Sequence, residues 1–117
     1  MIVHIVSDNL SKISQLAFAF DQKHEVITLY SDLEKYSNVV ILMDEKSAKE
    51  KYSNPISLHD FTPKKDTTYV VGKNYPDTPL HEQIPDDKKY DILYIPLSKP
   101  TPLHAEVALG IVLYNFK

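Results

Sequence analysis

The feature that most constrains this chain is a series of short apolar runs separated by segments with helical spacing or polar composition. The clearest run is Asn38-Val39-Val40-Ile41-Leu42-Met43, whose apolar residues would occupy both faces of a strand. A strand that is apolar on both faces is typical of the centre of a parallel sheet with helices on either side. The sequence therefore predicts an α/β fold with a mostly parallel sheet and helices on both faces.

The rest of the chain alternates in the same way. Strands are expected at residues 2–6, 25–30, 67–71 and 90–95, and helices at residues 10–20, 31–36 and 103–114. Residues 44–52 are expected to form a helix or turn, and residues 56–58 a short strand or an extended connection. Ser7-Asp8-Asn9 offers capping oxygens to the first helix. Pro102 would open the last helix, with Thr101 as its N-cap. Residues 73–89 contain Pro76, Pro79 and Pro85, so we expect a long irregular segment there.

Length and composition exclude several classes of protein. A chain of 117 residues accommodates one domain. It has no cysteine, which removes disulfide frameworks, thiolate nucleophiles and zinc–cysteine sites. The five histidines are scattered without metal-ligand spacing, so no metal site is expected. No apolar stretch approaches the roughly 20 residues that span a bilayer, so we expect a cytoplasmic protein without a membrane segment.

The charge of the chain is unusual for a nucleic-acid binder. The formal net charge is −3, and all 13 cationic residues are lysines. Phosphate neutralisation supplies most of the affinity of such proteins, and arginine provides bidentate phosphate contacts. The composition therefore argues against a strong stand-alone RNA binder. Lys64-Lys65 and Lys88-Lys89 could form an RNA-facing edge, or they could be ordinary solvated lysines.

Two turns in the last third of the chain carry the functional signal. Val71-Gly72-Lys73-Asn74 ends one expected strand, and Ile95-Pro96-Leu97-Ser98 ends the next. The carboxyl ends of strands are where open α/β sheets bind ligands. The second turn leads into a helix of small and apolar residues that begins near His104-Ala105-Glu106-Val107-Ala108.

This order of elements, over residues 67–116, resembles the SPOUT superfamily of α/β-knotted, S-adenosylmethionine-dependent RNA methyltransferases. In that family a Val-Gly turn is followed by an Ile-Pro-Leu-like turn, and a small-residue helix closes the chain through a trefoil knot. The stretch from His104 to Ala108 is also similar to a Pro-His-small-Glu-Val-Ala stretch of the archaeal tRNA cytidine 2′-O-methyltransferases. Here Leu103 separates Pro102 from His104.

The resemblance implies a minimal SPOUT-like domain over residues 1–117, with a C-terminal knot and cofactor region at residues 67–117. It assigns the binding of S-adenosylmethionine to six residues: Val71, Gly72, Lys73, Ile95, Leu97 and Leu103. His104 and Glu106 are the candidate catalytic residues. The expected partners are tRNA or rRNA, or a ribonucleoprotein, and a second copy of the chain that packs through the C-terminal helix.

The sequence also departs from the family pattern. Members that methylate a ribose 2′-hydroxyl commonly use an N-terminal arginine, and this chain has none. A second hypothesis is therefore a catalytically silent SPOUT-like structural protein, associated with the ribosome or another ribonucleoprotein. A third is a flavodoxin-like or nucleotide-binding domain without a knot.

Several site residues have a simpler explanation as well. Gly72 could be only a strand-end turn, and His104 could be a half-exposed residue without catalytic function. Glu106 would be favoured by the positive end of the last helix. Gly110, in the middle of that helix, costs about 1 kcal/mol relative to alanine, which a close approach of another segment would justify.

Overall fold

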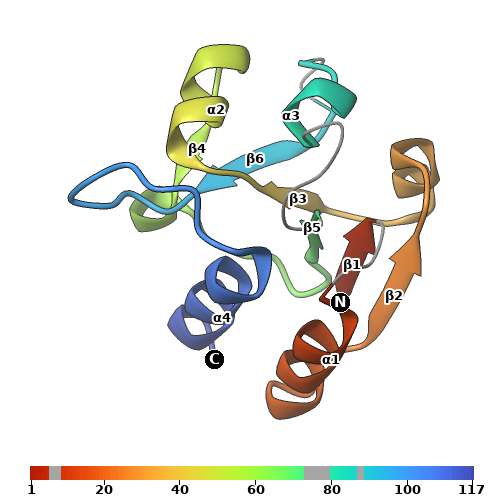
Figure 1. Cartoon of the computed structure of the whole chain (residues 1–117). Helices are drawn as coiled ribbons and strands as arrows, with labels where there is room; N and C mark the ends of the chain where they lie inside the picture. Colours follow the sequence, from red (N-terminus) through yellow and green to blue (C-terminus); the bar gives the residue numbers. More distant parts are fainter. Residues whose placement is uncertain (6–8, 73–79, 87–88) are drawn as a thin grey trace.

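The structure is a computed structural model that describes residues 1–5, 9–72, 80–86 and 89–117. Its centre is a six-stranded sheet in the order β2-β1-β5-β3-β6-β4, in which every neighbouring pair is parallel (Figure 1). The strands are β1 (Ile2–Ile5), β2 (His24–Ile27), β3 (Val39–Leu42), β4 (Ile56–Ser57), β5 (Thr68–Val71) and β6 (Asp91–Tyr94).

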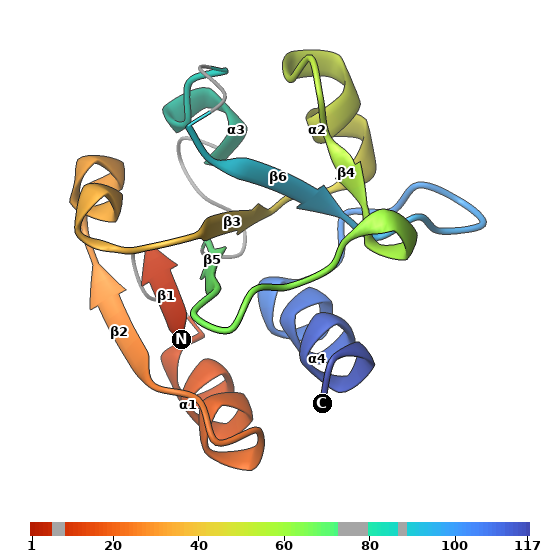
Figure 2. The same cartoon turned by 180° about the vertical axis from the view of Figure 1, so that it is seen from behind.

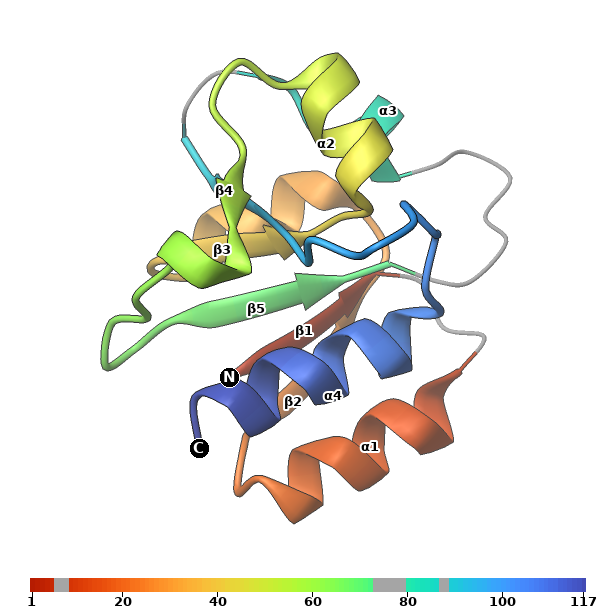
Figure 3. The same cartoon turned by 90° about the vertical axis from the view of Figure 1, so that its left-hand side faces the viewer.

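Helices cover both faces of this sheet. The α-helices are α1 (Leu10–Ala19), α2 (Glu45–Lys51), α3 (Leu80–Gln83) and α4 (Ala105–Asn115), and the short 3-10 helices are η1 (Tyr30–Lys35) and η2 (Leu58–Asp60). Helices α1 and α4 lie side by side on one face, whereas α2 and α3 lie on the other (Figures 1 and 3). The predicted α/β class, with a parallel sheet and helices on both faces, is confirmed.

The burial of the central strands on both faces explains why their sequences are mostly apolar. All four residues of β1, β3 and β5 are buried. Along β3, Val40 and Leu42 join the cluster beneath α1 and α4, whereas Val39 and Ile41 join the cluster beneath α2 and α3. Successive side chains of a strand point to opposite faces, so a strand covered on both sides favours apolar residues at every position, as in β3, although β1 and β5 also bury His4 and Thr68. This confirms the interpretation of residues 38–43.

Three boundaries differ from the sequence-based expectation. The second strand ends at Ile27, because the chain turns there into η1. The last helix begins at Ala105, so the assignment of Thr101 and Pro102 to its start is wrong: His104 has an extended backbone (ψ 146°) and is itself the N-cap. The short helix α3 lies within the segment that was expected to be irregular, directly after Pro79.

Some expectations fall outside the described residues. Ser7 and Asp8, two of the three proposed capping residues, are among them, as are Lys73 and Lys88. The predicted trefoil knot depends on the path of the loop after β5, which includes residues 73–79, so the knot stays a prediction. In the part of the chain that is described, no helix has the length and apolar character needed to cross a membrane.

The two ends of the chain lie at the same end of the molecule (Figures 2 and 3). Met1 and Lys117 both line an open depression at the amino ends of the strands. The amino group of Met1 donates hydrogen bonds to the side chain of Gln22 (2.5 Å) and to the carbonyl of Thr67 (3.5 Å). These bonds fix the start of β1 beside the start of β5.

Gly110 is the point where α4 faces α1. A Cβ atom built on Gly110 would lie 3.6 Å from Cδ2 of Leu16, which is an ordinary van der Waals contact. The two helices therefore approach each other here, but a methyl group still fits.

We predict that Gly110→Ala raises the free energy of unfolding by about 0.5–1 kcal/mol, because alanine has the higher helix propensity and restricts the unfolded chain. Urea denaturation of the two proteins measures the difference. A lower stability of the variant would show that α1 and α4 need the closer approach that only glycine allows.

Candidate functional site

A cavity of about 440 Å³ opens at the carboxyl ends of three strands. Its wall comes from the ends of β3, β5 and β6, the first turn of α2, and the segment from Ile95 into α4. Small-molecule sites usually measure about 300–1,000 Å³ and favour the carboxyl edge of a parallel sheet. By size and position this is the candidate functional site.

The residues that the resemblance assigns to a cofactor meet at this cavity. Val71 and Gly72 reach it from β5, and Ile95, Leu97 and Leu103 reach it from the segment between β6 and α4. The sixth, Lys73, lies outside the described residues. Because β5 and β6 both pair with β3, the turns that follow them end up on two sides of one cavity. His104 also lines the cavity, whereas Glu106 does not.

Gly72 gives the cavity wall an open stretch of main chain. Its φ angle is not positive, so the backbone itself does not require glycine. A Cβ atom there would contact the Leu80 side chain at 3.5 Å, which is an ordinary distance. Gly72 therefore contributes main-chain atoms to the cavity wall. It is not needed for a backbone conformation that only glycine can adopt.

The polar part of the lining contains two carboxylates together with Ser47, His81, Thr101 and His104. Asp44 and Glu45 follow β3 directly and line the cavity together with Ser47. Asp44 is the N-cap of α2 and accepts a hydrogen bond from the Ser47 backbone N–H at 3.0 Å. Sequence reasoning missed both carboxylates as site residues. Their position directly after the most apolar strand was the available signal, because that is where a parallel sheet ends.

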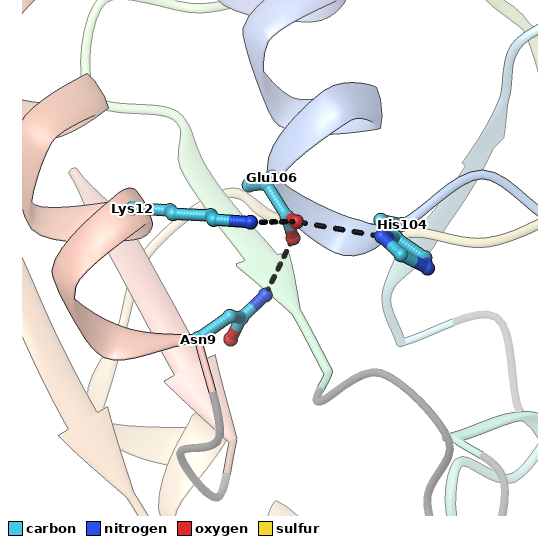
Figure 4. A network of polar contacts seen from close by, with 4 residues as sticks. All are labelled: Asn9, Lys12, His104 and Glu106. Atoms are coloured by element: carbon cyan, nitrogen blue, oxygen red, sulfur yellow. Dashed lines mark hydrogen bonds and ion pairs between the residues drawn. The ribbon is translucent and has the colours of Figure 1, made fainter.

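A second polar cluster ties α1 to α4 beside the cavity (Figure 4). Asn9 donates a hydrogen bond from Nδ2 to Oε2 of Glu106 at 2.8 Å. The other carboxylate oxygen of Glu106 lies 3.7 Å from Nζ of Lys12 and 3.6 Å from Nδ1 of His104. The Glu106 side chain is only 10% exposed, compared with 48% for His104 and 67% for Lys12. Glu106 is thus the buried centre of this cluster.

The side chain of Asn9 does not cap helix α1, although the residue stands at the N-cap position. It is buried and reaches Glu106, 97 positions away in the chain. The sequence suggested Asn9 as a possible cap and, through the family resemblance, as the one suggestive residue where an N-terminal motif would start. It indicated neither the bond to Glu106 nor a role for Lys12, because a contact over this separation leaves no local pattern.

This arrangement places a histidine where it can exchange protons with a bound molecule. The His104 side chain borders the cavity, and the buried Glu106 carboxylate lies beside its Nδ1 atom. A carboxylate beside one ring nitrogen can orient an imidazole, and an imidazole in a ligand cavity can act as a general base. The same contacts also fasten the start of α4 to α1, so Glu106 has a structural effect as well.

The lysine pairs lie away from the cavity. Lys64 and Lys65 precede β5, and Lys89 precedes β6, so all three are at the amino end of the sheet. Nζ of Lys89 pairs with Glu34 at 2.7 Å. The proposed RNA-facing edge made of lysine pairs would therefore stand at the opposite end of the sheet from the cavity.

No protein-family model matches this chain, and no curated protein matches it either. The functional argument therefore rests on the geometry of the chain's own residues.

We predict that Asn9→Ala lowers the free energy of unfolding by about 1–3 kcal/mol, because the buried Glu106 carboxylate loses its amide donor. Urea denaturation provides the measurement, and Asn54→Ala, at an exposed asparagine, is the matched control. Equal losses for the two variants would contradict a structural tie between α1 and α4.

Proposed function

We propose that this chain binds S-adenosylmethionine in the cavity and is a SPOUT-like RNA methyltransferase of the cytoplasm. One observation supports this above all others: five residues assigned to the cofactor by the resemblance, from two separate turns, line the same cavity. They come together although the first and the last of them are more than thirty positions apart in the chain.

The chemistry of the lining suits an adenosyl compound. Apolar side chains such as Leu42, Val71 and Leu93 offer walls for a flat adenine ring. The Asp44 carboxylate, whose Oδ2 accepts a hydrogen bond from the Ser47 N–H, has a second oxygen that could accept from a hydroxyl or ammonium group, whereas Glu45 is paired with Lys49. An adenosyl sulfonium with an amino-acid tail has donors and positive charge, so it complements an acidic lining better than a phosphorylated nucleotide does.

His104 and Glu106 would serve the transfer step. When bound, the cofactor supplies an electrophilic methyl group. Nε2 of His104 would accept the proton of an RNA hydroxyl as that oxygen attacks, and Glu106 would stabilise the resulting imidazolium through Nδ1. Asn9 and Lys12 hold the Glu106 carboxylate in place, so they act on the histidine only through it.

The exposed side of α4 supports the proposed homodimer. Val107, Ile111 and Tyr114 recur at helical spacing and are 47%, 38% and 63% exposed. An apolar stripe on a helix at the surface is typical of an interface. If α4 of a second copy packed on this stripe, the resulting homodimer would contain two cavities, one from each copy.

A catalytically silent SPOUT-like protein, associated with the ribosome or another ribonucleoprotein, is the second candidate. The chain has no arginine, its net charge is −3, and Lys64, Lys65 and Lys89 lie at the end of the sheet opposite the cavity. These features favour a protein that keeps the domain and its cavity but depends on other molecules for contact with RNA.

The cofactor proposal predicts that the wild-type protein binds S-adenosylmethionine with a dissociation constant of roughly 1 μM to 1 mM, the usual range for enzyme ligands. Ala108→Leu, which extends a side chain of α4 into the cavity, should weaken binding at least about tenfold through overpacking. Isothermal titration calorimetry measures both constants. Ala19→Leu, the same change at an exposed alanine of α1 away from the cavity, should leave binding unchanged.

The absence of a binding signal for wild-type protein at millimolar cofactor would remove the cofactor proposal. Equal binding by wild-type protein and Ala108→Leu would place the ligand elsewhere.

The transferase proposal predicts that His104→Gln lowers the rate of methyl transfer by about 10²–10⁴-fold, the usual contribution of a general base, and leaves the dissociation constant unchanged. Incorporation of tritiated methyl groups into total tRNA and rRNA measures the rate. Cofactor binding by the wild-type protein without transfer to any RNA would favour the catalytically silent alternative.

A further inference from the structure

The short helix α3 forms part of the cavity wall. Its first two residues, Leu80 and His81, both line the cavity. The Leu80 side chain also lies against the turn that ends β5, because a Cβ atom built on Gly72 would be 3.5 Å from Cδ2 of Leu80. The position of α3 therefore decides the shape of the cavity next to this turn.

A helix of this length does not stay in place by itself. α3 has only four residues, whereas isolated helices shorter than about 12–15 residues are marginally stable in water. The last carbonyl groups of any helix also lack partners within that helix. The positions of Leu80 and His81 must therefore depend on contacts that other elements make with α3.

Tyr52, at the end of α2, supplies such a contact. Helices α2 and α3 are neighbours on the same face of the sheet (Figure 3). The Tyr52 hydroxyl donates to the carbonyl of Ile84, directly after α3, at 2.7 Å, and it lies 3.3 Å from the carbonyl of His81. A side chain from the end of α2 thus provides the donor that the last carbonyl groups of α3 require.

This contact lies inside the core. Ile84 is fully buried, and Tyr52, only 5% exposed, belongs to the same apolar cluster. Burial raises the pKa of the Tyr52 hydroxyl to about 12, and the charge of Asp86 adds to this shift. The hydroxyl therefore keeps its proton at neutral pH and remains a donor. A buried carbonyl that lost this donor would have no access to water in its place, so the loss is costly.

A second contact joins the same two segments at the surface. The backbone N–H of Ser53 donates to Oδ2 of Asp86 at 3.1 Å, and the Ser53 hydroxyl donates to Oδ1 at 3.3 Å. These bonds are exposed, whereas the bond from Tyr52 to Ile84 is buried. Water competes with exposed hydrogen bonds and strengthens none of them, so the buried bond has the larger effect on α3.

We propose that Tyr52 is a positioning residue, whose hydroxyl holds α3 so that Leu80 and His81 form one wall of the cavity. The contact of this wall with S-adenosylmethionine rests on the proposed function, whereas the link between Tyr52 and α3 does not. The alternative is that Tyr52 stabilises the domain as a whole through the core and has no local effect on α3.

Amide hydrogen exchange of the ligand-free protein tests the link. Tyr52→Phe removes the hydroxyl and keeps the ring in the core. The Ile84 amide, which donates to the Leu80 carbonyl at 3.1 Å, should exchange about tenfold faster, because local opening of α3 no longer breaks a buried hydrogen bond. Tyr69→Phe removes a hydroxyl from another buried tyrosine, at the opposite end of the sheet, and should leave the Ile84 amide unchanged.

The Thr68 amide reports on the stability of the whole sheet. It donates to the carbonyl of Asn38 at 3.0 Å, between β5 and β3. If Tyr52 acts only through global stability, Tyr52→Phe speeds exchange at Thr68 and leaves the local opening at Ile84 unchanged. Unchanged exchange at Ile84 in Tyr52→Phe would overturn the proposal, as would an equal acceleration at Ile84 in Tyr69→Phe.

Titration with S-adenosylmethionine tests the wall. Calorimetry should give a dissociation constant about threefold to tenfold weaker for Tyr52→Phe, equivalent to one hydrogen bond. His81→Ala removes the imidazole from the wall but keeps the carbonyl that faces Tyr52, so it should weaken binding without accelerating exchange at Ile84. Glu82→Ala, at an exposed residue of the same helix, should change neither quantity.

The two proposals fail in different ways. If wild-type protein binds no S-adenosylmethionine, the proposed function falls, and the exchange rates alone still decide whether Tyr52 holds α3. If wild-type protein binds the cofactor and both Tyr52→Phe and His81→Ala bind it equally well, the proposed function stands and the positioning of a ligand wall by Tyr52 falls.

Discussion

The burial of the parallel sheet on both faces is the constraint from which the rest of this structure follows. Every residue of β1, β3 and β5 is buried, so these strands offer little room for polar chemistry along their length. Polar side chains must instead gather where strands end and loops begin. That is where Asp44, Glu45 and His104 lie, and it is why one edge of the sheet contains both a cavity and the titratable groups around it.

The sequence predicted most of what depends on local pattern. A strand apolar on both faces, such as β3, is visible in the order of its residues. The turns at Gly72 and at Pro96 were visible because glycine and proline interrupt apolar runs. Their meeting at one cavity follows from the pairing of β5 and β6 with the same strand, and only a resemblance to a known order of elements anticipated it.

What the sequence could not predict depends on distant partners. Asn9 has the residue type of a helix cap, yet its side chain bonds to Glu106 at the far end of the chain. The start of α4 was placed too early because Thr101 and Pro102 have the composition of a helix start, whereas the chain stays extended up to His104. The short helix α3 begins directly after Pro79, where the sequence has the composition of a proline-started helix although the surrounding segment was expected to be irregular. For Asn9 and the start of α4, contacts with distant parts of the chain decided the structure, and the local preference of the residue types for a cap or a helix start did not.

Charge is divided between the two ends of the sheet. Carboxylates border the cavity at the carboxyl end, and lysines such as Lys64 and Lys65 stand at the amino end. A small ligand with donors and positive charge suits the first environment, and a polyanion suits the second. Lys12 is an exception, because its exposed side chain pairs with Glu106 beside His104 and would be the described cation nearest to an RNA that delivered a hydroxyl to this histidine.

The position of the chain ends has a practical consequence. Met1 and Lys117 border the same depression, on the side of the sheet away from the cavity. A fluorescent label, an affinity handle or a fused domain at Lys117 would thus stay clear of ligand entry, whereas an addition at Met1 would replace the amino group that bonds to Gln22 and Thr67. A short linker between the two ends would suffice for a circularly permuted version, whose new ends could be opened in a surface loop.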